Sequence, residues 1–204
     1  PGALEAELAD ALGQDAEPAR VAPGLETGPN WVRRWRREGV STEAALARFD
    51  TLPPVMPDEM LGAWRGGGLP TGHSLDGLLE HLGWHGKHFA SVDHVDPLVF
   101  EPGIALDPRL MPVRIALRWP RVAKSAATRT AFRLCRRLLR ASGPAARLAT
   151  VGFRGSASAA MVYDRQPIVD HFRRIDERRI LGLMNMRGVT PYFFLLTKDA
   201  VGEW

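Results

Sequence analysis

The chain has 204 residues, of which 45% are hydrophobic and 25% are charged. These proportions are typical of a water-soluble globular protein, and the length allows one domain with a substantial core. No run of about 18 apolar residues occurs, so no membrane-spanning helix is expected. The first residues predict no secretory signal, and a single cysteine, Cys135, excludes a disulfide framework. We therefore expect a cytoplasmic protein.

The formal net charge is +4 and the isoelectric point is about 9.8. A basic chain of this kind can bind nucleic acid or an anionic membrane surface. No nucleic-acid-binding motif is present, and the aromatic residues do not alternate with the arginines as they do in RNA-binding sheets. Nucleic acid is therefore not an expected partner.

Residues 1–57 predict a helical appendage with a linker. Residues 1–12 have leucines on one helical face, and the Pro/Gly-rich residues 13–30 follow. Trp31 and Trp35 are spaced i, i+4, so a helical turn would place them together. Ser41 is a suitable N-cap for a second helix, which a proline-rich stretch ends.

Residues 58–204 predict a single barrel domain, with an N-terminal part at 58–102 and a C-terminal part at 113–198. The N-terminal part begins with a strand in which Trp64 is flanked by glycines on one face. The turn Thr71–Ser74 offers backbone N–H groups to an anion, and Ser74 is the expected N-cap of a short helix that ends at Gly83. Extended segments follow from Trp84 to Ser91 and around Leu98–Phe100.

The C-terminal part begins with two less regular segments. Residues 113–117 predict a short strand. Residues 124–141 predict one amphipathic helix, with Cys135 on its apolar face. This helix is either a solvated cover of the barrel or a peripheral contact with anionic lipid headgroups. The arginines on its polar face are Arg129, Arg133, Arg136, Arg137 and Arg140.

From residue 147 the sequence predicts strands separated by short turns, which form an antiparallel meander. The expected strands are Arg147–Arg154, Ser156–Tyr163, Ile168–Ile175, Arg179–Met186 and Tyr192–Lys198. The strands near residues 183 and 194 are apolar on both faces, so one face would line a lumen and helices would cover the other. Small residues at 156–160 would leave room in that lumen. We predict an α+β fold: a closed β-barrel with the N-terminal helices and the basic helix packed outside.

Several segments resemble the bacterial family named for its GXWXG motif, here Gly62-Ala-Trp64-Arg-Gly66, which is joined to a C-terminal domain of unknown function. The resemblance covers roughly residues 61–198. It includes Pro70-Thr71-Gly72-His73, Gly86-Lys87, Arg154-Gly155, Tyr163-Asp164 and Pro191-Tyr192-Phe193-Phe194. Ser74, His85, His88 and Asn185 depart from the family pattern, in which Pro, Tyr, Arg and Asp are expected. The resemblance implies a barrel that binds lipid-like ligands, lipocalin-like by analogy.

Candidate site residues come from polar side chains on apolar faces. Asp170 alternates with Ile168 and Phe172, and a buried carboxylate needs a partner, for which Lys87 and Arg154 are candidates. This pair is either structural or functional. The expected ligand-binding residues are Trp64, Thr71, His73, Trp84, Lys87, Arg154, Tyr163, Asp170 and Phe172.

The leading hypothesis is binding of a lipid or other hydrophobic molecule, such as an anionic phospholipid, in the barrel. A second hypothesis is a small cyclase, isomerase or hydrolase with Asp170, His73 and Asp76 as acid and base. For Asp76, stabilisation of a helix N-terminus is an equally good explanation. A third hypothesis is a protein-interaction module. No cofactor is expected. No metal is expected either, because glycines interrupt the histidine spacing at 81–88.

Overall fold

The computed structural model describes residues 30–199, and the predicted helix at 1–12 lies outside them. The helical elements are α2 (Asn30–Glu38), α3 (Thr42–Thr51), η1 (Pro57–Met60), α4 (Leu78–Leu82), η2 (Pro108–Leu110), α5 (Val113–Arg118), α6 (Pro120–Ala123), α7 (Ala126–Cys135) and η3 (Arg136–Leu139). The strands are β1 (Gly62–Gly68), β2 (Trp84–Ser91), β3 (His94–Phe100), β4 (Ile104–Ala105), β5 (Ala146–Phe153), β6 (Ser156–Tyr163), β7 (Ile168–Arg174), β8 (Arg179–Met186) and β9 (Tyr192–Lys198).

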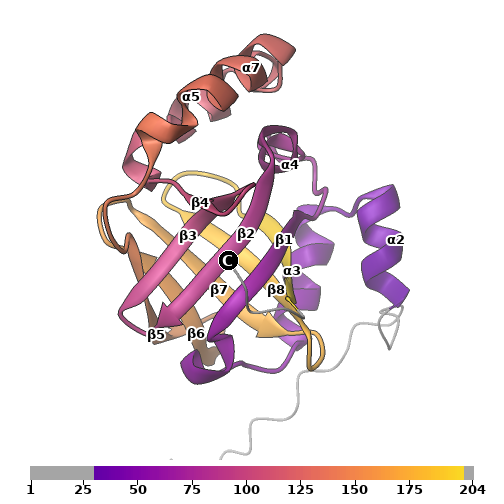
Figure 1. Cartoon of the computed structure of the whole chain (residues 1–204). Coiled ribbons are helices and arrows are strands. Elements are labelled where there is room, and N and C mark those ends of the chain that lie inside the picture. Colours follow the sequence, from indigo (N-terminus) through magenta and orange to yellow (C-terminus); the bar gives the residue numbers. More distant parts are fainter. Residues whose placement is uncertain (1–29, 200–204) are drawn as a thin grey trace, which may run out of the picture.

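Eight of the strands in the described residues form a closed antiparallel barrel (Figure 1). The strand order is β2-β1-β9-β8-β7-β6-β5-β3, and a further pairing between β2 and β3 closes the ring. The short β4 adds to the edge of β3. The predicted fold class is therefore confirmed, and the predicted bounds of β6, β8 and β9 agree with the structure.

Successive side chains of β8 and β9 point alternately into two separate apolar clusters. Ile180 and Phe194 point into the barrel, where they pack with the interior core. Leu181 and Phe193 point outward and pack against residues of α2 and α3, among them Trp31. The N-terminal helices therefore cover the outer face of the sheet, as the two-faced apolar pattern predicts. Figure 1 shows α2 and α3 beside the barrel wall.

The predicted ends of α3 and α4 are confirmed in part. Ser41 caps α3 by accepting a hydrogen bond from the backbone of Ala44, and Gly83 ends α4 in the left-handed conformation. Ser74 is not an N-cap, because residues 74–77 form turns and α4 begins only after Gly77, which has a φ of 72°. The prediction of Ser74 as N-cap was therefore wrong.

Residues 113–117 form helix α5, so the predicted strand was wrong. A short apolar run does not distinguish a strand from a helix. Here Val113, Ala116 and Leu117, spaced i, i+3 and i+4, pack against the interior core. In Figure 1, α5 and α7 lie over one end of the barrel. We call residues 108–140, which include η2, α5, α6, α7 and η3, the cap.

The predicted single helix at 124–141 is also corrected, because it divides into α7 and η3. The chain after Cys135 must return to the barrel edge: Asp107 donates from its backbone to Leu139 at 2.9 Å, and Ala141 donates to Ala105 at 2.9 Å. This pairing draws the last turn out of the α-helical path. Cys135 is exposed and is not core filler. Within residues 30–199, no helix has the length and apolarity needed to cross a bilayer.

Candidate functional site

A cavity of about 190 Å³ lies at the end of the barrel that the cap covers. Its walls are almost entirely apolar and come from the inner faces of α4, the cap helices and the barrel strands. The main lining residues are Leu75, Leu78, Leu79, Leu82, Trp84, Lys87, Leu98, Met111, Val113, Ala116, Phe132, Leu139, Tyr163, Ile168, Asp170, Met184, Tyr192 and Phe194. A pocket of this size and composition is suited to a small organic ligand.

Two glycines make room for the aromatic walls of this cavity. A Cβ atom on Gly66 would lie 2.2 Å from the indole of Trp84, and a Cβ on Gly182 would lie 2.2 Å from the ring of Phe194. Because real Cβ contacts never approach so closely, only glycine permits these two rings to lie against the barrel wall. The second glycine of the GXWXG motif therefore shapes the cavity.

The floor of the cavity holds a buried ion pair between β2 and β7. Lys87 Nζ lies 2.8 Å from Asp170 Oδ2 and 3.2 Å from the carbonyl oxygen of Pro97. The two charged residues are 3% and 1% exposed. The ammonium also lies 5.0 Å from the ring centroid of Phe194, which adds a favourable cation–π contact. Of the two partners predicted for Asp170, the structure selects Lys87.

Tyr163 joins this pair from β6. Its hydroxyl lies 3.5 Å from Asp170 Oδ2. Burial and the nearby Asp170 carboxylate raise the pKa of Tyr163 well above its ordinary value, so the phenol keeps its proton. Tyr163, Lys87 and Asp170 thus form one polar group in an otherwise apolar cavity.

Three polar atoms among the cavity residues are buried without a hydrogen-bond partner in the described structure: Asp170 Oδ1, Trp84 Nε1 and Tyr192 Oη. Burying such an atom without a partner costs roughly 1–3 kcal/mol. Burial and the surrounding carboxylates raise the pKa of Tyr192, which therefore also keeps its proton. One carboxylate acceptor, one indole donor and one hydroxyl without partners therefore belong to residues that line the cavity.

The predicted turn at residues 71–74 has a different role. The backbone N–H groups of Thr71 and His73 each donate to Asp76 Oδ2 at 2.9 Å, so the turn holds its own carboxylate and does not offer these donors to an anion. His73 Nδ1 accepts from the backbone of Leu75 at 3.1 Å. Burial lowers the pKa of His73. Its ring contacts Tyr192 at 5.4 Å between centroids and is not among the cavity walls.

Three other predicted ligand residues also lie outside the cavity. Trp64 and Phe172 are buried in the interior core, where Trp64 Nε1 donates to the carbonyl of Met60 at 2.7 Å. Arg154 lies in the turn between β5 and β6 and forms a bidentate ion pair with Asp50. The cavity is therefore lined by Trp84 and not by Trp64, which the sequence analysis also expected to bind the ligand.

The small residues of β6 do not create the cavity either. Ala159 belongs to the interior core, and the Ser158 hydroxyl donates to Phe172 at 2.8 Å and accepts from Val55 at 2.9 Å. Ser158 therefore fastens the segment before η1 to the barrel. The space at the cap end instead arises from Gly66 and Gly182.

The histidines of β2 make separate surface pairs. His85 Nε2 lies 2.9 Å from Asp199, and His88 Nδ1 lies 3.7 Å from Asp96. Within residues 30–199, no three His, Cys, Asp or Glu side chains are grouped as a metal ion would require. His171, on the outer face of β7, stacks on Phe153 with 3.8 Å between ring centroids.

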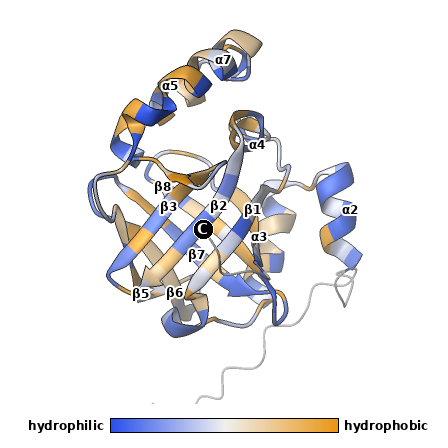
Figure 2. Ribbon diagram, in the orientation of Figure 1, coloured by the Kyte–Doolittle hydropathy of each residue, from blue (hydrophilic) through white to orange (hydrophobic). Residues whose placement is uncertain are grey.

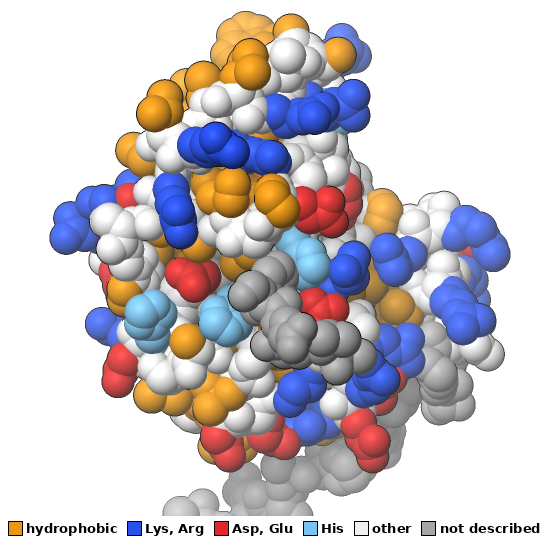
Figure 3. Space-filling model, in the orientation of Figure 1, with side chains coloured by type: hydrophobic (Ala, Val, Ile, Leu, Met, Phe, Trp, Pro, Cys, Tyr) orange, Lys and Arg blue, Asp and Glu red, His pale blue; other side chains and the backbone are white. Residues whose placement is uncertain are grey.

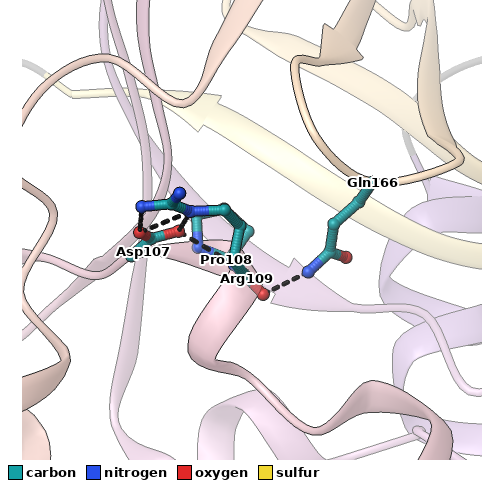
Figure 4. Close-up of polar contacts among 4 residues, drawn as sticks. All are labelled: Asp107, Pro108, Arg109 and Gln166. Carbon is teal, nitrogen blue, oxygen red and sulfur yellow. Dashed lines mark hydrogen bonds and ion pairs between the residues drawn. The ribbon is translucent and has the colours of Figure 1, made fainter.

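Polar contacts among Asp107, Pro108, Arg109 and Gln166, drawn in Figure 4, hold the beginning of the cap in place. Asp107 caps η2 by accepting from the backbone of Arg109 at 2.9 Å, and its carboxylate also binds the Arg109 guanidinium. This guanidinium lowers the pKa of Asp107. The Gln166 amide, from the turn between β6 and β7, donates to the carbonyl of Pro108. Pro108 and Gln166 both line the cavity, so this contact joins the cap to the barrel.

Sequence reasoning missed Tyr192, Phe194, Met184 and the leucines of α4 as cavity residues. Tyr192 and Phe194 share one parity on β9, which was a usable signal for an inward face. The cap residues that line the cavity could not be identified from the sequence, because their position depends on how residues 108–140 fold back over the barrel.

Two protein-family models match the chain. The model described as GXWXG protein matches residues 47–103, and the domain of unknown function DUF4334 matches residues 144–198. The first contributes β1–β3 and the second β5–β9, so both build one barrel. Residues 104–143, between them, hold β4 and the cap helices.

A solved structure, described as the crystal structure of a protein from Thermomonospora curvata, is similar to this chain. The two are 31% identical, the alignment covers 83% of this chain and 97% of that one, and the TM-score is 0.57. No curated protein matches the chain. The chain belongs to the family of GXWXG proteins that carry the C-terminal domain DUF4334.

Proposed function

We propose that this protein binds a compact hydrophobic molecule with one polar, uncharged group in the cavity under the cap. The observation that carries the proposal is the set of unpartnered polar atoms, Asp170 Oδ1, Trp84 Nε1 and Tyr192 Oη, on residues that line a cavity whose walls are otherwise apolar. A hydroxyl group on the ligand would donate to Asp170 Oδ1 and accept from Trp84 Nε1 or Tyr192 Oη, and the apolar part of the ligand would replace water along the walls.

The cavity volume sets the size of this ligand. An apolar cavity of about 150 Å³ accommodates a benzene molecule. The 190 Å³ here is about a quarter larger, so it suits a compact ring compound somewhat larger than benzene. A diacyl phospholipid would leave most of its acyl chains outside, so the volume favours a smaller molecule.

Charge favours an uncharged polar group over an anionic one. Lys87 is already neutralised by Asp170, and the remaining acceptor on that pair is itself a carboxylate oxygen. A ligand carboxylate placed there would meet like charge in a region of low dielectric, which is unfavourable. A hydroxyl could donate to Asp170 Oδ1 and accept from Trp84 or Tyr192.

Three ring compounds of matched size separate these cases: naphthalene, naphthol and naphthoate. Isothermal titration calorimetry at pH 7 should show naphthol binding at least about tenfold more tightly than naphthalene, because a hydrogen bond to a charged group is worth about 1.5–3 kcal/mol. Naphthoate should bind most weakly. Tightest binding by naphthoate would indicate an anion site, and no heat with any of the three would refute the binding proposal.

A matched pair of variants locates the binding. Met184→Trp places an indole in the cavity and should abolish naphthol binding. Asn185→Trp adds the same indole at the next, exposed position of β8 and should leave binding unchanged. Equal effects of the two substitutions would show that naphthol binds elsewhere.

A second candidate function is acid–base catalysis on the bound molecule. It is favoured by the unpartnered oxygen of Asp170, a residue that lines the cavity beside the protonated Tyr163. His73 and Asp76 do not line this cavity, so Asp170 would act without them. If Asp170 abstracts protons, tetralone in deuterated buffer should exchange its α-hydrogens faster with the protein than with Asp170→Asn, followed by NMR. Equal exchange rates would exclude this role for tetralone.

A further inference from the structure

The cap is apolar on its outer surface as well as on the face that lines the cavity. Eight large apolar side chains are exposed in residues 30–199, and six of them belong to the cap. Leu134 at the end of α7 and Leu138 in η3 are 78% and 81% exposed. The others in the cap are Leu110, Ile115, Trp119 and Val122.

The cap is also strongly basic. Residues 109–140 contain no Asp or Glu and ten basic residues: Arg109, Arg114, Arg118, Arg121, Lys124, Arg129, Arg133, Arg136, Arg137 and Arg140. The formal net charge of the whole chain is only +4, so the positive charge is concentrated here. Figure 3 shows the basic and apolar side chains together over the cap, and Figure 2 shows the same mixture along α5 and α7.

We propose that the outer face of the cap docks on the surface of an anionic lipid bilayer. Exposed leucine, isoleucine and tryptophan side chains would enter the headgroup region, and the neighbouring arginines would pair with lipid phosphates. The charge complementarity selects an anionic surface. A nucleic acid would satisfy the arginines but leave the aliphatic side chains in water, and a second copy of this chain would bring two basic caps together.

The position of the cap gives this docking a use. Val113 and Ala116 of α5 and Phe132 of α7 line the cavity, while Ile115 of α5 and Leu134 of α7 are exposed, as are Trp119 and Leu138 in the adjoining cap segments. A cap seated on a bilayer would place the cavity within a helix diameter of the lipid. A hydrophobic ligand would then reach the cavity without crossing water. The docking itself does not depend on which ligand the cavity holds.

The test is sedimentation of the full chain with vesicles of phosphatidylcholine alone or mixed with phosphatidylglycerol. The protein should bind the mixed vesicles and not the neutral ones. Arg133→Gln with Arg137→Gln removes two exposed charges and should weaken binding about thirtyfold, because each basic side chain near an anionic surface strengthens binding roughly fivefold. Arg33→Gln with Arg36→Gln, on α2, makes the same charge change beside the barrel and should have little effect.

The apolar contribution is tested separately. Leu134→Ser with Leu138→Ser should weaken vesicle binding at least about tenfold, because two leucines no longer enter the lipid. Val92→Ser, in the turn after β2 at the opposite end of the barrel, is the control and should leave binding unchanged. All four cap positions are exposed, so the variants should keep the thermal stability of the parent.

Three results would overturn the proposal. The first is no binding to the mixed vesicles. The second is an equal loss of vesicle binding in the cap variants and in their controls. The third is binding to a DNA duplex that is as tight as vesicle binding and insensitive to Leu134→Ser with Leu138→Ser. Self-association abolished by the leucine substitutions, in protein that does not sediment with vesicles, would assign this face to a second copy of the chain.

Discussion

The buried pair Lys87–Asp170 gives the most informative perturbation of stability. The two groups are 2.8 Å apart and almost fully buried, and Asp170 keeps one oxygen without a partner. Removing one member, as in Lys87→Met or Asp170→Leu, leaves the other as an unpaired charge. Such a change costs about 3–5 kcal/mol. Protonating an ordinary aspartate at pH 7 costs about 4 kcal/mol, so neutralisation of the orphaned carboxylate does not avoid the loss.

The double variant Lys87→Met with Asp170→Leu should behave differently. It replaces both charges by apolar side chains, which relieves the unpaired atom, so its free energy of unfolding should return to within about 1 kcal/mol of the parent or exceed it. For a chain of this length each kcal/mol shifts Tm by roughly 2–4 °C, so each single variant should lose about 6–20 °C. The strong non-additivity is the expected signature of a directly coupled pair.

The assay is urea unfolding followed by circular dichroism, with naphthol titration of every folded variant. The double variant should be stable and yet lose the preference for naphthol over naphthalene, because the acceptor oxygen of Asp170 is gone. Single variants that lose less than about 1 kcal/mol, or losses that simply add in the double variant, would refute the reasoning about this pair.

Three further predictions concern the cavity wall and the outer face of the sheet. Gly66→Ala should lower the free energy of unfolding by about 1–3 kcal/mol and reduce naphthol binding, because its Cβ meets the Trp84 indole. Gly152→Ala, where nothing lies within 4 Å of the added Cβ, is the control, and a similar loss there would contradict the explanation. Asn185→Trp and Met184→Trp should both fold with parent-like circular dichroism. Burial and Arg173 lower the pKa of His171 to about 4. The folded protein therefore favours the neutral imidazole, and the free energy of unfolding should have its full value above pH 6.5. It should fall by about 3 kcal/mol at most as the pH drops from 6.5 to 4. His171→Phe keeps the stacked ring and should flatten the stability profile in that window, and an unchanged slope in urea unfolding from pH 4 to 7 would contradict the assignment.

The barrel was predictable from the sequence because its signal is local. Side chains alternate with a period of two, so Ile180 and Leu181 had to face opposite sides of β8, and short turns required antiparallel neighbours. The inward position of Asp170 followed from the same alternation. The choice of Lys87 over Arg154 as its partner did not follow from the alternation, because Arg154 lies in a hairpin turn where the alternating pattern of the strand ends.

The cavity could not be placed from the sequence. Its position depends on the barrel register, which brings Gly66 opposite the Trp84 ring, and on the return of the chain over the barrel end. The segment at 113–117 was wrongly predicted as a strand because five residues are too few to show whether the apolar positions repeat with a helical or a strand period. Its helical conformation is stabilised by packing on the interior core, which the sequence does not reveal. The turn at Thr71 was misread for a similar reason, since the Asp76 carboxylate already accepts its N–H donors.

The most direct test of the central claim is a crystal structure of the full chain grown with saturating naphthol. We predict naphthol density under the cap, with its ring against the side chains of Trp84 and Phe194 and its hydroxyl within hydrogen-bond distance of Asp170 Oδ1. A cavity filled by its own side chains, or naphthol bound only outside the barrel, would contradict the account.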